Sequence, residues 1–237
     1  MQEFNLFGIP YVGSDVCGFR GATNEELCLR WQQLGAFHSF FRNHNDIFNP
    51  PQDPPQWASV QKATKAANAF RYQYLPYLYS YVLVTHSDST DSNHLSLHFH
   101  ATIQGGTVVR PVFFEFPMDS QTHALSYQFM WGSAVMVIPV TSPVSVHRIS
   151  ICTMNKLQGV LSVNGYLPSS EEWYSIAGEV KNYGKKAQAG YITVPAPVDT
   201  PLPTFLRAGF TLPRQKPAMT TALSRANSLQ LLVALSK

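Results

Sequence analysis

The first 45 residues combine two hydrophobic periodicities in an order that restricts the possible folds. Residues 6–16 form a short apolar run rich in β-forming residues, which predicts a buried strand ending near Asp15. Thr23, followed three residues later by Glu26, is a capping-box pattern and predicts the start of a helix. A second polar cluster, residues 42–45, follows as the end of another strand. Between them, apolar side chains recur at helical spacing: Leu27, Trp31, Leu34 and Phe41.

This order predicts that polar side chains meet at the carboxyl ends of neighbouring parallel strands. A (β/α) barrel presents its working residues at that edge. Asp15 ends the first predicted strand, and Arg42 and His44 lie at the end of the second. A carboxylate there can accept hydrogen bonds from the hydroxyl groups of a ligand, whereas an aspartate in a loop commonly caps a helix or pairs with a basic side chain. From the residues alone, both roles stay open for Asp15.

The pattern of the chain changes after its first hundred residues. A long helix is predicted from Trp57 to Leu78, with a kink or a cap at Pro76, because small and apolar residues repeat at three- and four-residue steps. From residue 105 onward, short apolar runs alternate with Gly and Pro turns, which predicts an all-β sandwich. The predicted strands are 107–116, 129–140, 191–194, 204–212 and 229–235.

Two stretches do not follow these patterns. Residues 83–104 are rich in Ser, Thr, Asp and His, and residues 143–161 interrupt a predicted pair of strands. Neither has a periodicity that would let it pack, so both are predicted to be disordered surface loops. A sharper hypothesis is translated intron sequence, which is wrong if both segments occur in the spliced message. The predicted domains are residues 1–104 and 105–237, each with one insert.

Composition excludes several classes of function. With 45% hydrophobic and 13% charged residues, the chain can build a core. The net charge of +3 and the lack of any Lys/Arg-rich run argue against nucleic acid as a partner. No apolar stretch is long enough to span a bilayer, and residues 1–30 lack the pattern of a secretory signal. The histidines match no zinc-binding spacing, so neither a metal nor a cofactor is expected.

Several short motifs occur in one characteristic order. The first part of the chain carries G-S-D-V-C-G-F at 13–19, C-L-R-W-Q-Q-L-G-A-F at 28–37 and R-N-H-N at 42–45. The β-rich part carries R-P-V-F-F-E-F-P at 110–117 and L-R-A-G-F at 206–210. Q-F-M-W-G, I-P-V and P-A-P-V-D-T lie between these two. In this order the chain resembles glycoside hydrolase family 31 over nearly its whole length. The resemblance implies the C-terminal part of a (β/α)8 TIM barrel followed by a β-sandwich domain.

The same resemblance implies roles for individual side chains. His44 and Asp15 would bind the sugar that is cleaved, and Phe19 would line the same pocket. An aromatic wall suits the apolar face of a sugar ring, and a histidine can donate to a sugar hydroxyl. Arg42 would support the pocket by pairing with a carboxylate rather than by touching sugar.

The state of two cysteines indicates the cellular compartment in which the protein is found. From the residues alone, Cys17 and Cys28 are compatible with a disulfide or with two buried free thiols. The resemblance implies the disulfide and therefore an oxidising compartment, so the intact protein is expected in the lysosome, secreted or at the cell surface. In glucosidase II of the same family the first cysteine is usually Gly and the later motif usually reads R-A-H-A. Cys17, Asn43 and Asn45 therefore favour the branch that contains the lysosomal and intestinal α-glucosidases over glucosidase II or an α-xylosidase.

The chain lacks the two motifs that would supply the chemistry. A retaining glycosidase needs a nucleophilic carboxylate and an acid/base carboxylate. The family motifs that carry them, W-x-D-M-N-E and H-W-x-G-D, do not occur here, so no catalytic residue is assigned. We expect a fragment of an α-glucosidase that hydrolyses terminal α-1,4-linked glucose from maltose-like oligosaccharides, inactive alone. The alternative is a non-catalytic carbohydrate-binding pseudoenzyme or interaction module. Barrel strands without neighbours expose edges, so residues 1–104 are predicted to be poorly stable alone.

Overall fold

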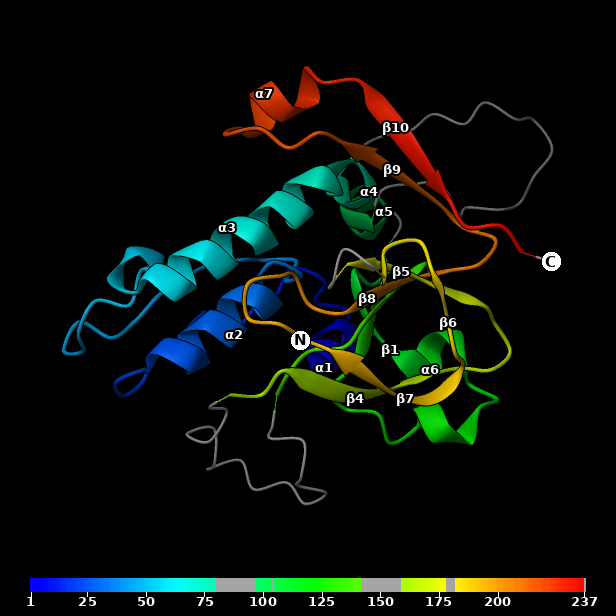
Figure 1. The fold of residues 1–237 in the computed structure, drawn as a ribbon, viewed down its shortest axis with the longest axis horizontal. Helices are drawn as coiled ribbons and strands as arrows, with labels where there is room; N and C mark the ends of the chain where they lie inside the picture. Colours follow the sequence, from blue (N-terminus) through cyan, green and yellow to red (C-terminus); the bar gives the residue numbers. More distant parts are fainter. Residues whose placement is uncertain (80–96, 104, 142–158, 178–181, 237) are drawn as a thin grey trace.

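The computed structural model describes residues 1–79, 97–103, 105–141, 159–177 and 182–236 (Figure 1). The two longest helices, Glu25–Gly35 and Ala58–Gln73, lie on one side of the molecule and most strands on the other (Figure 1). The short helices Gln2–Leu6 and Val112–Glu115 lie beside the strands (Figure 1). The helices are α1 (Gln2–Leu6), α2 (Glu25–Gly35), α3 (Ala58–Gln73), α4 (Leu75–Tyr79), α5 (Leu97–Ile103), α6 (Val112–Glu115) and α7 (Thr221–Arg225), with short 3-10 turns at Pro54–Gln56 and Ser120–Thr122.

The first predicted strand is wrong. Residues 2–6 form α1, and of residues 6–16 only Val16 makes a β-bridge. Gly8 has a φ of 79°, and Pro10 has no N–H to donate. The Val12 N–H donates to the Ser39 hydroxyl (3.0 Å), so a side chain satisfies the backbone here.

Helix α2 begins one residue away from the predicted cap. Its N-cap is Asn24, whose side-chain oxygen accepts from the Leu27 N–H (3.0 Å), and not Thr23. Glu26 accepts instead from the Gly159 N–H (3.0 Å). The helix ends at Gly35, so Phe41 does not extend its buried face.

The long helix predicted from 57 to 78 is confirmed in two pieces. Helix α3 ends at Gln73 and α4 starts at Leu75, so the break falls just before Pro76. Tyr74, at this break, is buried.

In the described residues, the β-rich part contains three antiparallel sheets. Six strands are ordered β1-β2-β3-β8-β5-β6, and two pairs, β4-β7 and β9-β10, stand beside them. The strands are β1 (Val109–Pro111), β2 (Phe129–Trp131), β3 (Val135–Val137), β4 (Ser162–Leu167), β5 (Trp173–Ala177), β6 (Lys186–Ala187), β7 (Gly190–Pro195), β8 (Thr204–Arg207), β9 (Thr211–Gln215) and β10 (Leu229–Val233).

The six-stranded sheet and the β4-β7 pair enclose a core of their own. Met136, Trp173 and Phe205 from the large sheet are buried there, and Val163 and Ile192 of the pair pack against them. This is the face-to-face packing of a β-sandwich.

Three predicted strands are shorter than expected. The run 107–116 yields the three-residue β1 and then α6. The run 129–140 turns back at Gly132, and the run 204–212 turns at Gly209; these glycines have φ of 63° and 80°, a region that few other residues adopt. Strands β4 and β5 were not predicted at all.

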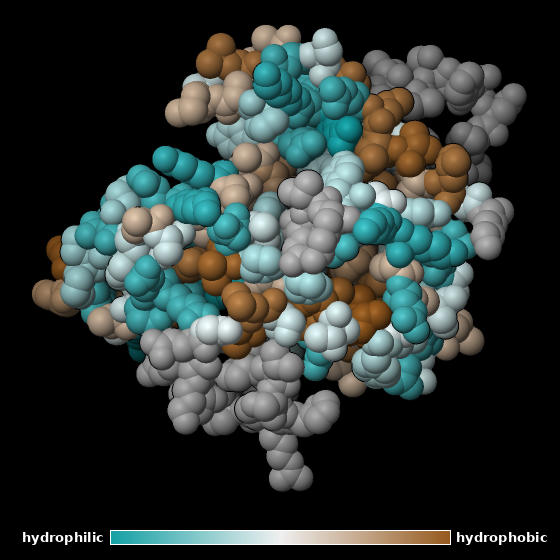
Figure 2. Space-filling model, in the orientation of Figure 1, coloured by the Kyte–Doolittle hydropathy of each residue, from teal (hydrophilic) through white to brown (hydrophobic). Residues whose placement is uncertain are grey.

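Hydrophobic side chains also gather on the outer surface. Figure 2 shows apolar residues over the β9-β10 hairpin. Leu229, Leu231 and Val233 alternate along β10 and are each more than half exposed. This strand is an edge of its two-stranded sheet.

The helical part and the large sheet share one hydrophobic core. Phe37 is buried after α2, and its ring lies 5.5 Å from Phe70, 5.3 Å from Trp131 and 6.5 Å from Phe129, centroid to centroid. Helix α5 joins the same core through Leu97 and Ala101. The first insert therefore packs over residues 97–103, contrary to the prediction; its remaining residues, and most of the second insert, lie outside the described residues. The boundary between 104 and 105 stays a prediction.

Candidate functional site

Two loops carry the predicted site residues and run side by side. The first loop contains Asp15 and Phe19, and the second contains Arg42 and His44. Val16 pairs with Asn43 in parallel, and the Val16 N–H donates to the Arg42 carbonyl at 2.8 Å. Close approach requires a glycine at 13, because a Cβ there would overlap the carbonyl oxygen of Phe40. Although the regular strands are missing, the ends of the two segments meet in parallel as the sequence predicted.

The first loop turns sharply after Val16. Cys17 has a φ of 73° and Gly18 a φ of 92°. A non-glycine residue in this region costs about 1–2 kcal/mol, so something must hold it. A disulfide joins Cys17 to Cys28 in α2, as the resemblance implied. The Gly18 N–H also donates to the carbonyl of Asp15 at 3.0 Å.

Phe19 and His44 come together at the open side of the turn. Their rings stack, with centroids 5.3 Å apart and planes inclined by 25°. Phe19 is 40% exposed and His44 is partly buried. The Asp46 N–H donates to the Phe19 carbonyl (3.1 Å), which fixes the backbone beneath the ring. The pair offers a flat apolar face beside an imidazole that can donate a hydrogen bond.

Asp15 and Arg42 lie at the same junction. The Asp15 side chain is partly buried, and within the described residues its carboxylate makes no hydrogen bond or ion pair. Its oxygens are therefore able to accept from a ligand. Arg42 is exposed and makes no ion pair in the described part of the chain, so its predicted pairing with a carboxylate stays a prediction.

Gln52 is a site residue that the sequence analysis missed. It lies in the Pro-rich segment 50–55, which showed no pattern beyond that of a linker. Yet its side chain is buried, and its amide nitrogen is 3.1 Å from the Val16 carbonyl, 2.8 Å from that of Gly18 and 3.1 Å from that of His44. Hydrogen bonds over 34 to 36 positions leave no local signal in a sequence.

A partly buried arginine, Arg71, holds the chain between α2 and the second loop. One nitrogen of Arg71 donates to the carbonyls of Ala36 and His38, both at 2.7 Å. Burial lowers the pKa of Arg71 to about 10, which leaves it charged at neutral pH. His38 is fully buried, and its ring nitrogens have no partner among the described residues. Burial, aided by Arg71 and the amino terminus, lowers the pKa of His38 to about 3.

Helix α2 is anchored to the β-rich part from its other face. The Arg30 side chain is buried and donates to the carbonyl of Ala196 (3.0 Å) and to that of Val160. The Gln33 amide reaches three carbonyls of the segment 197–200, the nearest being Thr200 at 2.6 Å. The motif at 28–37 thus binds the P-A-P-V-D-T motif, and both support the helix to which the disulfide is tied.

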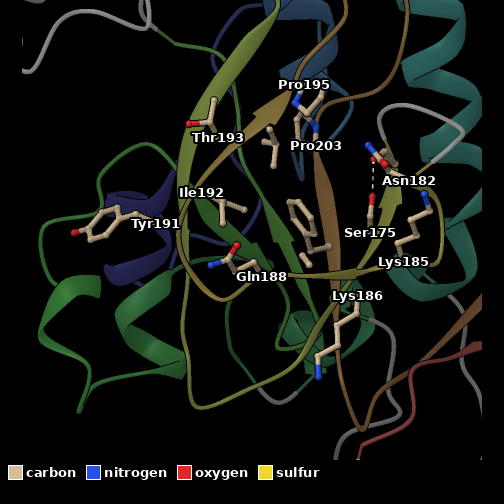
Figure 3. A pocket seen from close by; sticks show the side chains of 14 residues that line it. Ser175, Asn182, Lys185, Lys186, Gln188, Tyr191, Ile192, Thr193, Pro195 and Pro203 are labelled. Carbon is tan, nitrogen blue, oxygen red and sulfur yellow. Dashed lines mark hydrogen bonds between the residues drawn. The ribbon is translucent and has the colours of Figure 1, made fainter.

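A cavity of about 430 Å³ lies elsewhere, between β5, β6 and β7 (Figure 3). Its lining combines the apolar Ile192 and Phe205 with the polar Ser175 and Gln188. No predicted site residue lines it, so it is separate from the two-loop site.

Among the described residues, no group of three or more His, Cys, Asp or Glu could hold a metal ion. In the same residues, no helix has the length and apolar character that a bilayer span requires.

Family comparisons match both parts of the chain. Residues 1–81 match the glycosyl hydrolases family 31 TIM-barrel domain, and residues 105–212 match the glycosyl hydrolase family 31 C-terminal domain. These two matches together cover more than half of the chain and confirm the predicted fold class, part of a barrel followed by a β-sandwich.

Curated relatives align along almost the whole chain. It is 38% identical to the lysosomal alpha-glucosidase of Mus musculus over 99% of its length, and 39% identical to the alpha-glucosidase of Aspergillus niger over 98%. The alpha-glucosidase of Hordeum vulgare is 36% identical over 100%. The chain spans only 23%, 20% and 23% of these three relatives.

Solved structures agree on the fold. A family 31 dextranase of Flavobacterium johnsoniae, complexed with glucose, superposes with a TM-score of 0.77 at 23% identity, over 100% of this chain and 25% of its own. A family 31 alpha-xylosidase of Xanthomonas citri superposes with a TM-score of 0.75 at 24% identity, over 99% of this chain and 23% of its own.

Proposed function

The chain belongs to glycoside hydrolase family 31, and from that premise we propose that the intact protein is a retaining α-glucosidase. It releases glucose from terminal α-1,4 linkages of maltose-like oligosaccharides. The alpha-glucosidase names of mammalian, fungal and plant relatives support the substrate class.

The observation that carries the proposal is the parallel junction of the two loops, beside which the Phe19 ring stacks on His44 and Asp15 directly precedes the bridged Val16. The His44 imidazole donates to a hydroxyl of the bound glucose, and the Asp15 carboxylate accepts from one. Phe19 packs against the apolar face of the ring. Arg42 stands at the rim and pairs with a carboxylate once one is present.

The two carboxylates of the reaction come from a part of the protein that this chain does not contain. Hydrolysis with retention of the anomeric configuration requires a nucleophilic carboxylate and an acid/base carboxylate on either side of the glycosidic bond. Neither family motif for these groups occurs in the 237 residues. The chain therefore contributes binding and orientation to the pocket, and is inactive alone.

The disulfide supports an oxidising compartment. Cys17 and Cys28 are joined in the structure, and such bonds persist in secreted and endomembrane proteins. We place the intact protein in the lysosome, or secreted or at the cell surface. The name of the mouse relative, lysosomal alpha-glucosidase, agrees with the first of these.

A second candidate is a sugar-binding protein without turnover. The absence of both catalytic motifs from the sequence favours it. It differs from the first proposal in one respect, because here the complete protein has no nucleophile and no acid/base carboxylate in the pocket.

One experiment separates the two. The transcript is read upstream of Met1, and the longest in-frame product is assayed on maltose while NMR follows the anomer of the released glucose. The first proposal expects the α-anomer and a loss of activity in His44→Gln. Release of the β-anomer contradicts it. A message that codes for residues 1–237 only, with a product that binds glucose and hydrolyses nothing, supports the second candidate.

A further inference from the structure

We propose that Gln52 is the positioning residue of the sugar pocket. Its side-chain amide holds the loop that carries Phe19 and the loop that carries His44 at a fixed separation, so that the two rings stack. The inference rests on the proposed function only for the identity of the ligand.

The contacts of Gln52 converge from both loops. Its amide nitrogen lies 3.1 Å from the Val16 carbonyl and 2.8 Å from the Gly18 carbonyl, on either side of the strained turn. The third carbonyl, that of His44 itself, is 3.1 Å away in the other loop. Gln52 is 2% exposed, so it acts through its neighbours and does not touch sugar.

The chemistry of these contacts requires an amide. Three carbonyl oxygens are acceptors only, and a primary amide supplies two N–H donors without charge. A carboxylate would place negative charge against them, and a thioether would leave them without a donor. A further hydrogen bond holds Gln52 to the second loop. The Asn43 side chain donates to the backbone carbonyl of Gln52 (3.1 Å), and its nitrogen also lies 3.7 Å from the Cys17 sulfur.

No other single side chain among the described residues hydrogen-bonds to the backbone of both Gly18 and His44. The bridge between Val16 and Asn43 joins the loops on the near side of the turn. Beyond the turn, the Phe19 carbonyl accepts from the Asp46 N–H (3.1 Å) and from the Asn49 side chain (3.4 Å). Neither bond holds Gly18 or the backbone of His44, so loss of the Gln52 amide loosens the ring pair while these bonds and the Val16–Asn43 bridge stay in place.

Two variants of the full chain test the role of the amide. Gln52→Met keeps the length of the side chain and removes both donors. Gln52→Glu adds a carboxylate whose protonation is favoured by the surrounding carbonyls, so that on acidification it regains one donor. Gln61→Met is the matched control, because Gln61 is exposed on α3.

Two readouts are used on each protein. The first is the NMR shift of the His44 ring protons, which the stacked Phe19 displaces by its ring current. The second is the affinity for 1-deoxynojirimycin, a glucose-shaped iminosugar. Circular dichroism checks that the fold is kept.

We expect Gln52→Met to lose the ring-current displacement of His44 and to bind the iminosugar at least about tenfold more weakly, and Gln61→Met to match the unchanged chain. Gln52→Glu recovers part of both signals as the pH is lowered from neutral, relative to the unchanged chain at the same pH. A purely structural role would produce no such acid recovery.

An unchanged His44 shift and affinity in folded Gln52→Met would overturn the inference. Should Gln52→Met fail to fold, the pH response of Gln52→Glu decides, and its absence counts against the role. If the unchanged chain binds no iminosugar, the proposed function fails, while the His44 shift still tests Gln52.

Discussion

Truncation of Phe37 to alanine should destabilise the helical part and the sheet together. Phe37 is 1% exposed and its ring meets Phe70 from α3 as well as Phe129 and Trp131 from β2. Phe→Ala changes in cores typically cost about 3–5 kcal/mol. Contacts with three aromatic rings, each worth about 0.5–1.5 kcal/mol, place this one in the upper half of that range.

Urea unfolding followed by two probes measures the effect. Far-ultraviolet circular dichroism reports mainly on α2 and α3. Fluorescence, measured with Trp31 and Trp57 both replaced by phenylalanine in every protein compared, reports on the buried Trp131 and Trp173 of the sheet. The control Phe48→Ala, at a side chain that is 91% exposed, should change the free energy of unfolding by less than about 0.5 kcal/mol.

One shared core predicts that Phe37→Ala lowers both unfolding midpoints by the same amount. The reasoning is refuted if Phe37→Ala is as harmless as Phe48→Ala, or if only one of the two probes shifts. The second result would show that the helices and the sheet are separate cooperative units.

Three further predictions concern the disulfide, a buried histidine and the anchor of α2. Reduction of the Cys17–Cys28 bond should cost about 3 kcal/mol, seen as a lower melting temperature with reductant, and Cys17→Ser should then be insensitive to it. His38 has a pKa of about 3 when folded against 6.5 for the free group, so unfolding takes up a proton and stability falls as the pH drops from about 6.5 toward 3. His38→Phe should reduce the dependence of the unfolding free energy on pH by up to about 1.4 kcal/mol per pH unit. Urea unfolding at a series of pH values measures this dependence, and an unchanged dependence argues against a neutral buried ring. Gln33→Leu leaves partly buried carbonyls without their side-chain donor and should cost about 1–3 kcal/mol. Lys62→Ala breaks only an exposed ion pair and should cost under about 1 kcal/mol in the same assay, and equal costs would contradict this.

Regular helices were predictable because their signal is local. The repeat from Trp57 to Leu78 gave α3 and α4, and Pro76 gave the break between them. The strand expected over 6–16 failed because composition alone does not show that Gly8 and Pro10 interrupt an extended run, or that Ser39 supplies the missing hydrogen bonds.

Strands β4 and β5 were missed for a different reason. The segment 162–167 contains Asn164-Gly165, which resembles a turn, yet it pairs with β7 along its whole length. A Cβ at Gly165 would meet Ile138, the residue directly after β3, so the glycine allows close packing there and does not form a turn.

Part of the site was predictable and part was not. The approach of Asp15 to the loop of His44 follows from parallel strand ends, and the pairing of Cys17 with Cys28 followed from the family resemblance. Gln52 could not be found in this way, because its role depends on carbonyl groups that only the folded chain brings together.

The most direct test of the account is a calorimetric titration of residues 1–237 with 1-deoxynojirimycin. A pocket built from the two loops predicts binding at one site, weakened at least about tenfold, or about 1.4 kcal/mol, by Asp15→Ala and by His44→Ala, and unchanged by Phe48→Ala. A folded chain that binds no iminosugar, or binding that survives His44→Ala, would contradict it.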